Sequence, residues 1–179
     1  MYLSKKSLNR TNKSQTGAGL VELLIGIAII GIIAYLAVTR GTTAREGNTS
    51  NSAVSDMQIF INGVQKARPD KNYAGLAASE VCMHMPRNNC NQATNALSHS
   101  AGGAVTVGDS TIGGLSHATI TFALYPATAC GAASGAVADG VSEISIGGTP
   151  VKNATTAFSQ QAANGACGST PSTVVLAVR

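Results

Sequence analysis

The sequence predicts an α+β fold in which a long N-terminal helix packs against an antiparallel β-sheet. Two observations predict the helix. The stretch from Leu20 to Val38 is apolar with a single charge, and further along apolar residues recur every three or four positions. The sheet is predicted because segments of alternating apolar and polar residues occupy the second half of the chain. A chain of 179 residues has room for one globular domain and one appendage.

The first seventeen residues are basic. Four of the twelve Lys and Arg residues lie there and no acid does, whereas eight basic and eight acidic residues balance from position 18 onward. The net charge of +4 therefore belongs to the N-terminal segment. A nucleic-acid-binding protein would gather its positive charge on the folded domain. We expect no nucleic-acid binding by the globular domain.

The apolar run from Leu20 to Val38 has nineteen residues, and Glu22 is its only charge. As a helix it would reach roughly 28 Å, about the thickness of the hydrocarbon core of a membrane. The basic residues before it place the tail in the cytoplasm and the rest of the chain outside. This run has three possible interpretations: a cleaved secretory signal, a plain membrane anchor, or a segment in which Glu22 is functional. A carboxylate in an apolar span is costly and usually functional, which favours the third.

The segment from Thr16 to Ile27 resembles the class III signal of type IV pilins: a basic leader ends in Gly, and four mostly apolar residues precede a Glu. In that family a prepilin peptidase cuts after the Gly and methylates the new N-terminus. The resemblance implies cleavage after Gly17, N-methylation of Ala18, and Glu22 as the fifth residue of the mature chain. The long leader, and the absence of Pro between Ala18 and Arg68, point to the type IVb group.

Glu22 is expected to act as an assembly charge. A carboxylate four residues along a helix lies one turn away from Ala18, on the same face. In a stacked filament it can neutralise the α-amino group of a neighbouring subunit, so that subunits register by charge within an apolar core.

Beyond the apolar run, the chain is expected to continue as an amphipathic helix. Its apolar stripe consists of Val54, Met57, Ile61 and Val64, at spacings of three, four and three, with Phe60 beside them. Arg68-Pro69 ends it, because the residue before a proline disfavours the helical conformation. We expect four segments: a leader over 1–17 that is removed, a hydrophobic transmembrane and filament-core helix over 18–39, its amphipathic second half over 40–68, and a globular α+β head over 69–179. The pilin resemblance likewise implies a protruding helix with a domain on its second half.

The head is expected to hold three strands, over 118–125, 141–146 and 173–178, with a weaker candidate over 104–107. In the first of these, Ile120, Phe122 and Leu124 should share one face. Gly147-Gly148 predicts a tight hairpin turn into 149–151. The remaining expectations are a loop-rich connection with short helical pieces over 70–100, a short helix over 156–163, and surface loops over 127–140 and 164–173, which are rich in Ala, Gly, Ser and Thr.

Four cysteines lie in the part of the chain expected outside the membrane, where an oxidising periplasm makes disulfides the default. Three connectivities are possible, and the pairs Cys82–Cys90 and Cys130–Cys167 are favoured. The longer bridge would close the variable C-terminal region of type IV pilins, often called the D-region. A zinc site using Cys82, His84 and Cys90 is the alternative, but its spacing is poor and no fourth ligand is evident.

The resemblance implies a structural subunit, not an enzyme, without cofactor or metal. We expect a major pilin of a type IVb pilus, held in the inner membrane as a precursor with its head in the periplasm and then polymerised into a surface filament. Expected partners are further copies of the chain, the prepilin peptidase, an inner-membrane assembly platform with an ATPase, and a host or recipient cell-surface receptor. The filament would serve adhesion, aggregation or mating-pair contact, since the head looks similar to thin-pilus pilins of conjugative plasmids.

Two alternatives remain open. A type II secretion pseudopilin shares the same N-terminal signal, although the four cysteines and the lack of an acidic cluster after Glu143 count against it. A membrane-tethered or secreted binding domain would be cleaved near Ala44 or not at all.

Overall fold

The computed structural model describes residues 51–179. All of these belong to the second of two compact units, Ala44–Arg179. The predicted apolar helix, with Gly17, Ala18 and Glu22, lies outside the described residues. So does the beginning of the predicted amphipathic helix, over 40–50.

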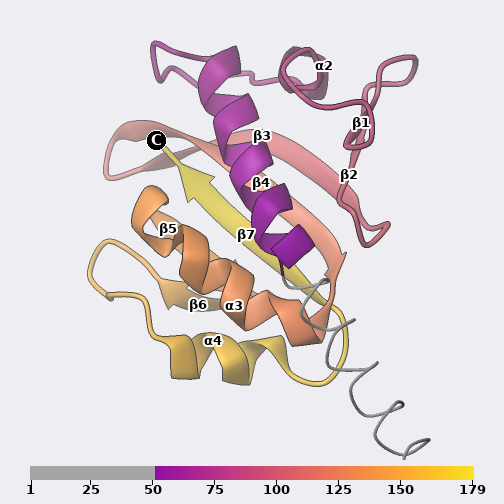
Figure 1. The fold of residues 1–179 in the computed structure, drawn as a ribbon. Coiled ribbons are helices and arrows are strands. Elements are labelled where there is room, and N and C mark those ends of the chain that lie inside the picture. The colour runs from indigo at the N-terminus through magenta and orange to yellow at the C-terminus, as the bar shows by residue number, and fades with distance from the viewer. Residues whose placement is uncertain (1–50) are drawn as a thin grey trace, which may run out of the picture. The chain divides into compact units, whose positions relative to one another are not determined.

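One seven-stranded sheet dominates the described part (Figure 1), in the order β1-β2-β3-β4-β7-β5-β6 with every neighbouring pair antiparallel. The strands are β1 (Cys90–Asn91), β2 (Ala96–Ser98), β3 (Ala104–Ile112), β4 (Leu115–Tyr125), β5 (Glu143–Ile146), β6 (Thr149–Lys152) and β7 (Ser172–Val178). The C-terminal strand β7 lies between β4 and β5 and so joins the two halves of the sheet. The predicted strands are confirmed, and the weak candidate over 104–107 is the start of the longer β3.

Two glycine pairs make the tight hairpins. Gly147 and Gly148, with φ of 57° and 83°, connect β5 to β6 as predicted, and Gly113 and Gly114, with φ of 59° and 78°, connect β3 to β4. A turn with positive φ at both central residues matches the right-handed twist of the flanking strands, and glycine adopts it without steric cost.

The helix over 51–67 lies across one face of the sheet (Figure 1). Its stripe packs on the core as predicted: Met57, Phe60 and Val64 are fully inaccessible, Ile61 is buried and Val54 is half-buried. The Phe60 ring meets the Phe122 ring of β4 edge to face, with centroids 5.4 Å apart, a favourable aromatic geometry. The expectation that this helix packs against an antiparallel sheet is therefore confirmed for the part of the chain that the structure describes.

The strand β4 departs from the predicted alternation at its end. Ile120 and Phe122 are fully buried, but Leu124 is 68% exposed and Tyr125 takes the inward position. The register of β4 on β7 shifts between Phe122 and Tyr125, which marks a bulge. The expectation that Leu124 shares the face of Ile120 and Phe122 is wrong, because one extra residue in a bulge reverses the facing of the residues after it.

The segment over 127–140, expected as a surface loop, is helical instead. It forms α3 (Ala127–Val137), which lies on the same face of the sheet as the helix over 51–67, and the 3₁₀ turn η1 (Ala138–Gly140). Alanine has the highest helix propensity, and five of the eleven residues of α3 are alanine. The expectation of a surface loop over 127–140 is wrong. Its small residues, which are common in turns, here let α3 pack closely against its neighbours.

The second helix of this region, α4 (Gln160–Cys167), begins later and ends later than predicted, so the expected loop over 164–173 starts only at Gly168. The Ser159 hydroxyl caps it by accepting a hydrogen bond from the backbone N–H of Ala162 at 3.3 Å. Gly131 and Gly135, one turn apart on α3, face α4. A Cβ on Gly131 would lie 2.0 Å from Asn164 Oδ1, and a Cβ on Gly135 would lie 2.5 Å from Gln160 Oε1, so glycine permits this close approach of the two helices.

Candidate functional site

The head contains two disulfides. Cys82, at the end of α2 (Ala78–Cys82), bonds to Cys90 in β1, and Cys130 in α3 bonds to Cys167 at the end of α4, with Cα–Cα distances of 5.5 and 5.9 Å. These are the two pairs that the sequence favoured. The alternative zinc site is excluded, because two of its three ligands form a disulfide. Within residues 51–179, no group of three His, Cys, Asp or Glu side chains is placed to hold a metal.

The Cys130–Cys167 bridge holds the C-terminal region together. Its sequence separation is 37 residues, so the chain-entropy model gives it about 4 kcal/mol of stabilisation. The helix α4 has only eight residues, too few to be stable alone. The bridge and the glycine face of α3 therefore hold α4 in place.

Sequence reasoning missed the buried carboxylate of Asp56, which is 5% exposed. Its Oδ1 accepts a hydrogen bond from Asn89 Nδ2 at 3.0 Å, and its Oδ2 accepts from the backbone N–H of Ser100 at 2.8 Å and the Ser100 hydroxyl at 2.6 Å. Three donors thus compensate the burial of one charge. The network ties the helix over 51–67 to the segment that carries β1 and β2.

A second polar contact fixes the same end of the helix to the sheet. The Tyr125 hydroxyl donates to the carbonyl of Ala53 at 2.6 Å, and His99 Nε2 lies 2.8 Å from the carbonyl of Ala123, to which it can only donate. Burial, aided by the negative charge of Asp56, raises the pKa of Tyr125 well above its usual range. The phenol therefore remains a donor at physiological pH.

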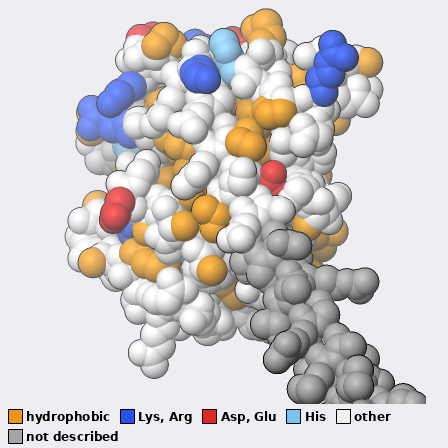
Figure 2. Space-filling view, viewed as in Figure 1, with side chains coloured by type: hydrophobic (Ala, Val, Ile, Leu, Met, Phe, Trp, Pro, Cys, Tyr) orange, Lys and Arg blue, Asp and Glu red, His pale blue; other side chains and the backbone are white. Residues whose placement is uncertain are grey.

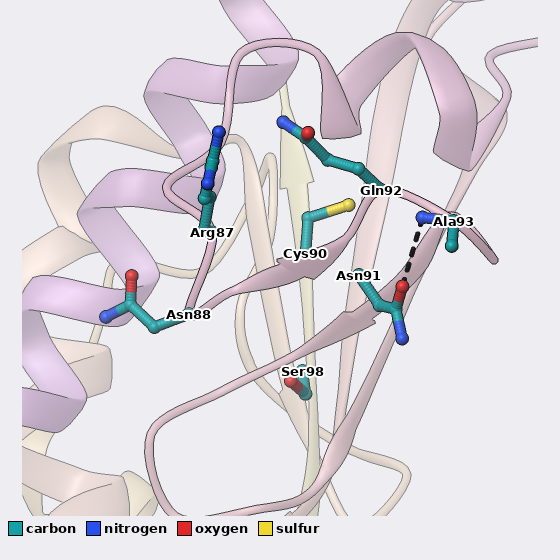
Figure 3. A pocket seen from close by; sticks show the side chains of 7 residues that line it. All are labelled: Arg87, Asn88, Cys90, Asn91, Gln92, Ala93 and Ser98. Carbon is teal, nitrogen blue, oxygen red and sulfur yellow. Dashed lines mark hydrogen bonds between the residues drawn. The ribbon is translucent and has the colours of Figure 1, made fainter.

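A polar hollow is lined in part by Cys90, one half of the Cys82–Cys90 disulfide, and Figure 3 shows the side chains around it. Its lining consists of Arg87, Asn88, Cys90, Asn91, Gln92, Ala93 and Ser98. Asn91 is already engaged, because its Oδ1 accepts from the backbone N–H of Ala93 at 3.0 Å. The lining offers amides and one positive charge, without a carboxylate or imidazole that could act as acid or base.

The surface of the head carries few charges (Figure 2). Six basic and six acidic residues lie over 51–179, so this part of the chain is formally neutral. A neutral, weakly charged surface lets copies of one chain approach without long-range repulsion.

The predicted processing and assembly residues, Gly17, Ala18 and Glu22, are not among the described residues. Over 51–179, none of the helices combines the length and the hydropathy that a membrane span requires.

Comparison with known protein families gives a match that covers the head. The family model PilS, described as PilS N terminal, matches residues 45–179, about three quarters of the chain. A search of curated proteins finds no match.

Proposed function

The chain belongs to the PilS family of type IV pilins, and from this premise we propose that it is the major subunit of a type IVb pilus. Type IV pilins are structural proteins that assemble themselves into a surface filament. The observation that carries the proposal is the match over the head, residues 45–179, together with an N-terminal signal that lies wholly outside the matched region. Two separate parts of the chain therefore support one function.

The proposed maturation begins at the inner membrane. The basic leader stays in the cytoplasm, the run from Leu20 to Val38 spans the bilayer, and the head folds in the periplasm. Two intact disulfides in the head suit that oxidising compartment. Prepilin peptidase then cuts after Gly17 and methylates Ala18, and an assembly platform driven by an ATPase adds the subunit to the filament.

The proposed use of the filament is contact between cells, as adhesion, aggregation or mating-pair contact with a host or recipient surface. The similarity to thin-pilus pilins of conjugative plasmids favours mating-pair contact. A type II secretion pseudopilin would undergo the same processing, but it would not be found in filaments sheared from the cell surface.

The Gly17→Leu variant is expected to accumulate in the inner membrane as the uncleaved precursor, with at least about a tenfold loss of filament. A bulky residue at the cut would not fit the peptidase, whereas insertion depends on the unchanged apolar run. Immunoblots of membrane and sheared fractions measure both effects. Gly19→Leu is the matched control and should be processed normally. If Gly17→Leu were processed normally and Gly19→Leu were blocked, the cleavage site would lie after Gly19, which would contradict cleavage after Gly17.

A further inference from the structure

Leu124 has an unfavourable backbone conformation, and no burial of its side chain compensates for the cost. Its φ is +53°, in the left-handed region that leucine rarely adopts, and 68% of the residue is exposed. Glycine or asparagine would take this backbone position at lower cost. The bulge in β4 thus exposes an apolar side chain to solvent at an energetic cost. A backbone outlier of this kind often marks a functional contact.

A second feature is a hollow of about 270 Å³ between the helix over 51–67 and the C-terminal end of α3. Ile61 and Val137 are almost fully buried and lie at its base, and exposed residues surround them. These are Gln58, Asn62, Ala136 and Gly140. An apolar cavity of about 150 Å³ accommodates benzene, which has more carbon atoms than a leucine side chain, so one leucine side chain fits in this hollow. An apolar base with an uncharged polar rim is the usual environment of an anchor residue.

The two features lie at opposite ends of α3. Leu124 comes just before Pro126, the N-cap of α3, while Ala136 and Val137 are at the other end of this eleven-residue helix. A helix of that length spans about 16 Å. Leu124 therefore cannot enter the hollow of its own chain, but it can enter that of a second copy.

A projecting side chain and a fitting hollow at different places on one molecule form a heterologous contact. Each copy inserts one leucine into a neighbour and accommodates one leucine from another neighbour. Such a contact produces an open helical array when the rotation that relates successive copies does not close into a ring. No charged side chain lines the hollow. These properties match what a filament of identical subunits requires.

We propose that Leu124 of one copy inserts into the Ile61–Val137 hollow of the next copy in the filament, an inference that rests on the proposed function.

The first test is Leu124→Asn in the full chain. Asparagine suits the left-handed backbone but removes the apolar anchor, so cellular subunit levels should match wild type while sheared filament falls at least about tenfold. Leu115→Asn is the control, because Leu115 is 43% exposed at the start of β4, far along the strand from Leu124. Filament yields at the wild-type level in Leu124→Asn would overturn the proposal.

The second test blocks the hollow. A Cβ on Gly140 meets nothing within 4 Å and its φ is not positive, so Gly140→Gln should leave the fold intact and fill the rim. Gly165→Gln, at an equally open helical glycine in α4, is the matched control. Filament yield should fall at least about tenfold only in Gly140→Gln. An equal yield in both variants would contradict the role of the hollow.

The third test is covalent. Cells that express one copy with Leu124→Cys and another, differently tagged, with Gly140→Cys should yield filaments containing a disulfide-linked pair of the two copies. Neither single variant should form this pair. Absence of the mixed pair from intact filaments would overturn the inference, whereas a wild-type chain that never forms filaments would instead overturn the proposed function.

Discussion

Replacing Glu22 with alanine is expected to abolish incorporation of the subunit into filaments. The run from Leu20 to Val38 becomes more apolar, so membrane insertion should persist, and Gly17 and Ala18 remain available for cleavage. The substitution removes the partner of the neighbour's α-amino group. An unpaired ammonium in an apolar environment costs several kcal/mol, and filament yield should therefore fall at least about a hundredfold.

The measurement compares sheared filament with total processed subunit for each variant. Glu46→Ala, which removes an acid beyond the apolar run, is the matched control and should assemble normally. Glu22→Asp keeps the charge on a shorter side chain and should retain part of the yield. Normal piliation of Glu22→Ala would rule out registration by charge.

Replacing Asp56 with alanine is expected to lower the free energy of unfolding of the head by about 3 kcal/mol. The change leaves Asn89 Nδ2 and two donors of Ser100 without the carboxylate that now accepts all three hydrogen bonds. Buried donors without acceptors carry their full desolvation cost. The unfolding temperature of a fragment over 44–179 should fall by about 10 °C.

Asp109→Ala provides the comparison, since Asp109 is an exposed acid in β3 and its loss should change stability by less than about 0.5 kcal/mol. Asp56→Asn should fall between the two, because an amide oxygen can still accept a hydrogen bond while its N–H₂ group faces another donor. Equal unfolding temperatures for Asp56→Ala and wild type would contradict the assigned role of the network.

The periodic elements of the fold could be predicted from the sequence. Met57, Phe60 and Val64 recur at helical spacing, and the alternation over 118–122 matches a strand that buries one face. The continuous apolar run over 174–178 matches a central strand of the sheet. Those patterns work because one face of each element meets the core. The Gly147-Gly148 turn was predictable for a local reason, since its backbone requires positive φ.

The errors come from interactions between distant residues. The alanines of α3 favour a helix, whereas its glycines resemble turn formers until α4 is placed against them, so the local sequence over 127–137 does not decide between a helix and a loop. The bulge at Leu124 arises where β4 meets β7, and no local pattern marks it. The short strands β1 and β2 could not be predicted, because two or three residues carry no detectable alternation.

The candidate site divides in the same way. The cysteine pairs could be favoured from four positions and the expected compartment. Asp56, in contrast, looks like an ordinary polar residue beside the helical stripe, and its partners Asn89 and Ser100 are 33 and 44 residues away along the chain. Only the folded arrangement shows that its charge is buried and fully hydrogen-bonded.

The central claim is that this chain is a processed pilin subunit, and mass spectrometry of its N-terminus in a sheared cell-surface fraction tests it most directly. The account predicts a chain that begins at Ala18, is heavier by one methyl group and carries both disulfides. A chain that begins near Gly41 to Arg45, or one that keeps Met1 and stays with the membranes, would contradict it.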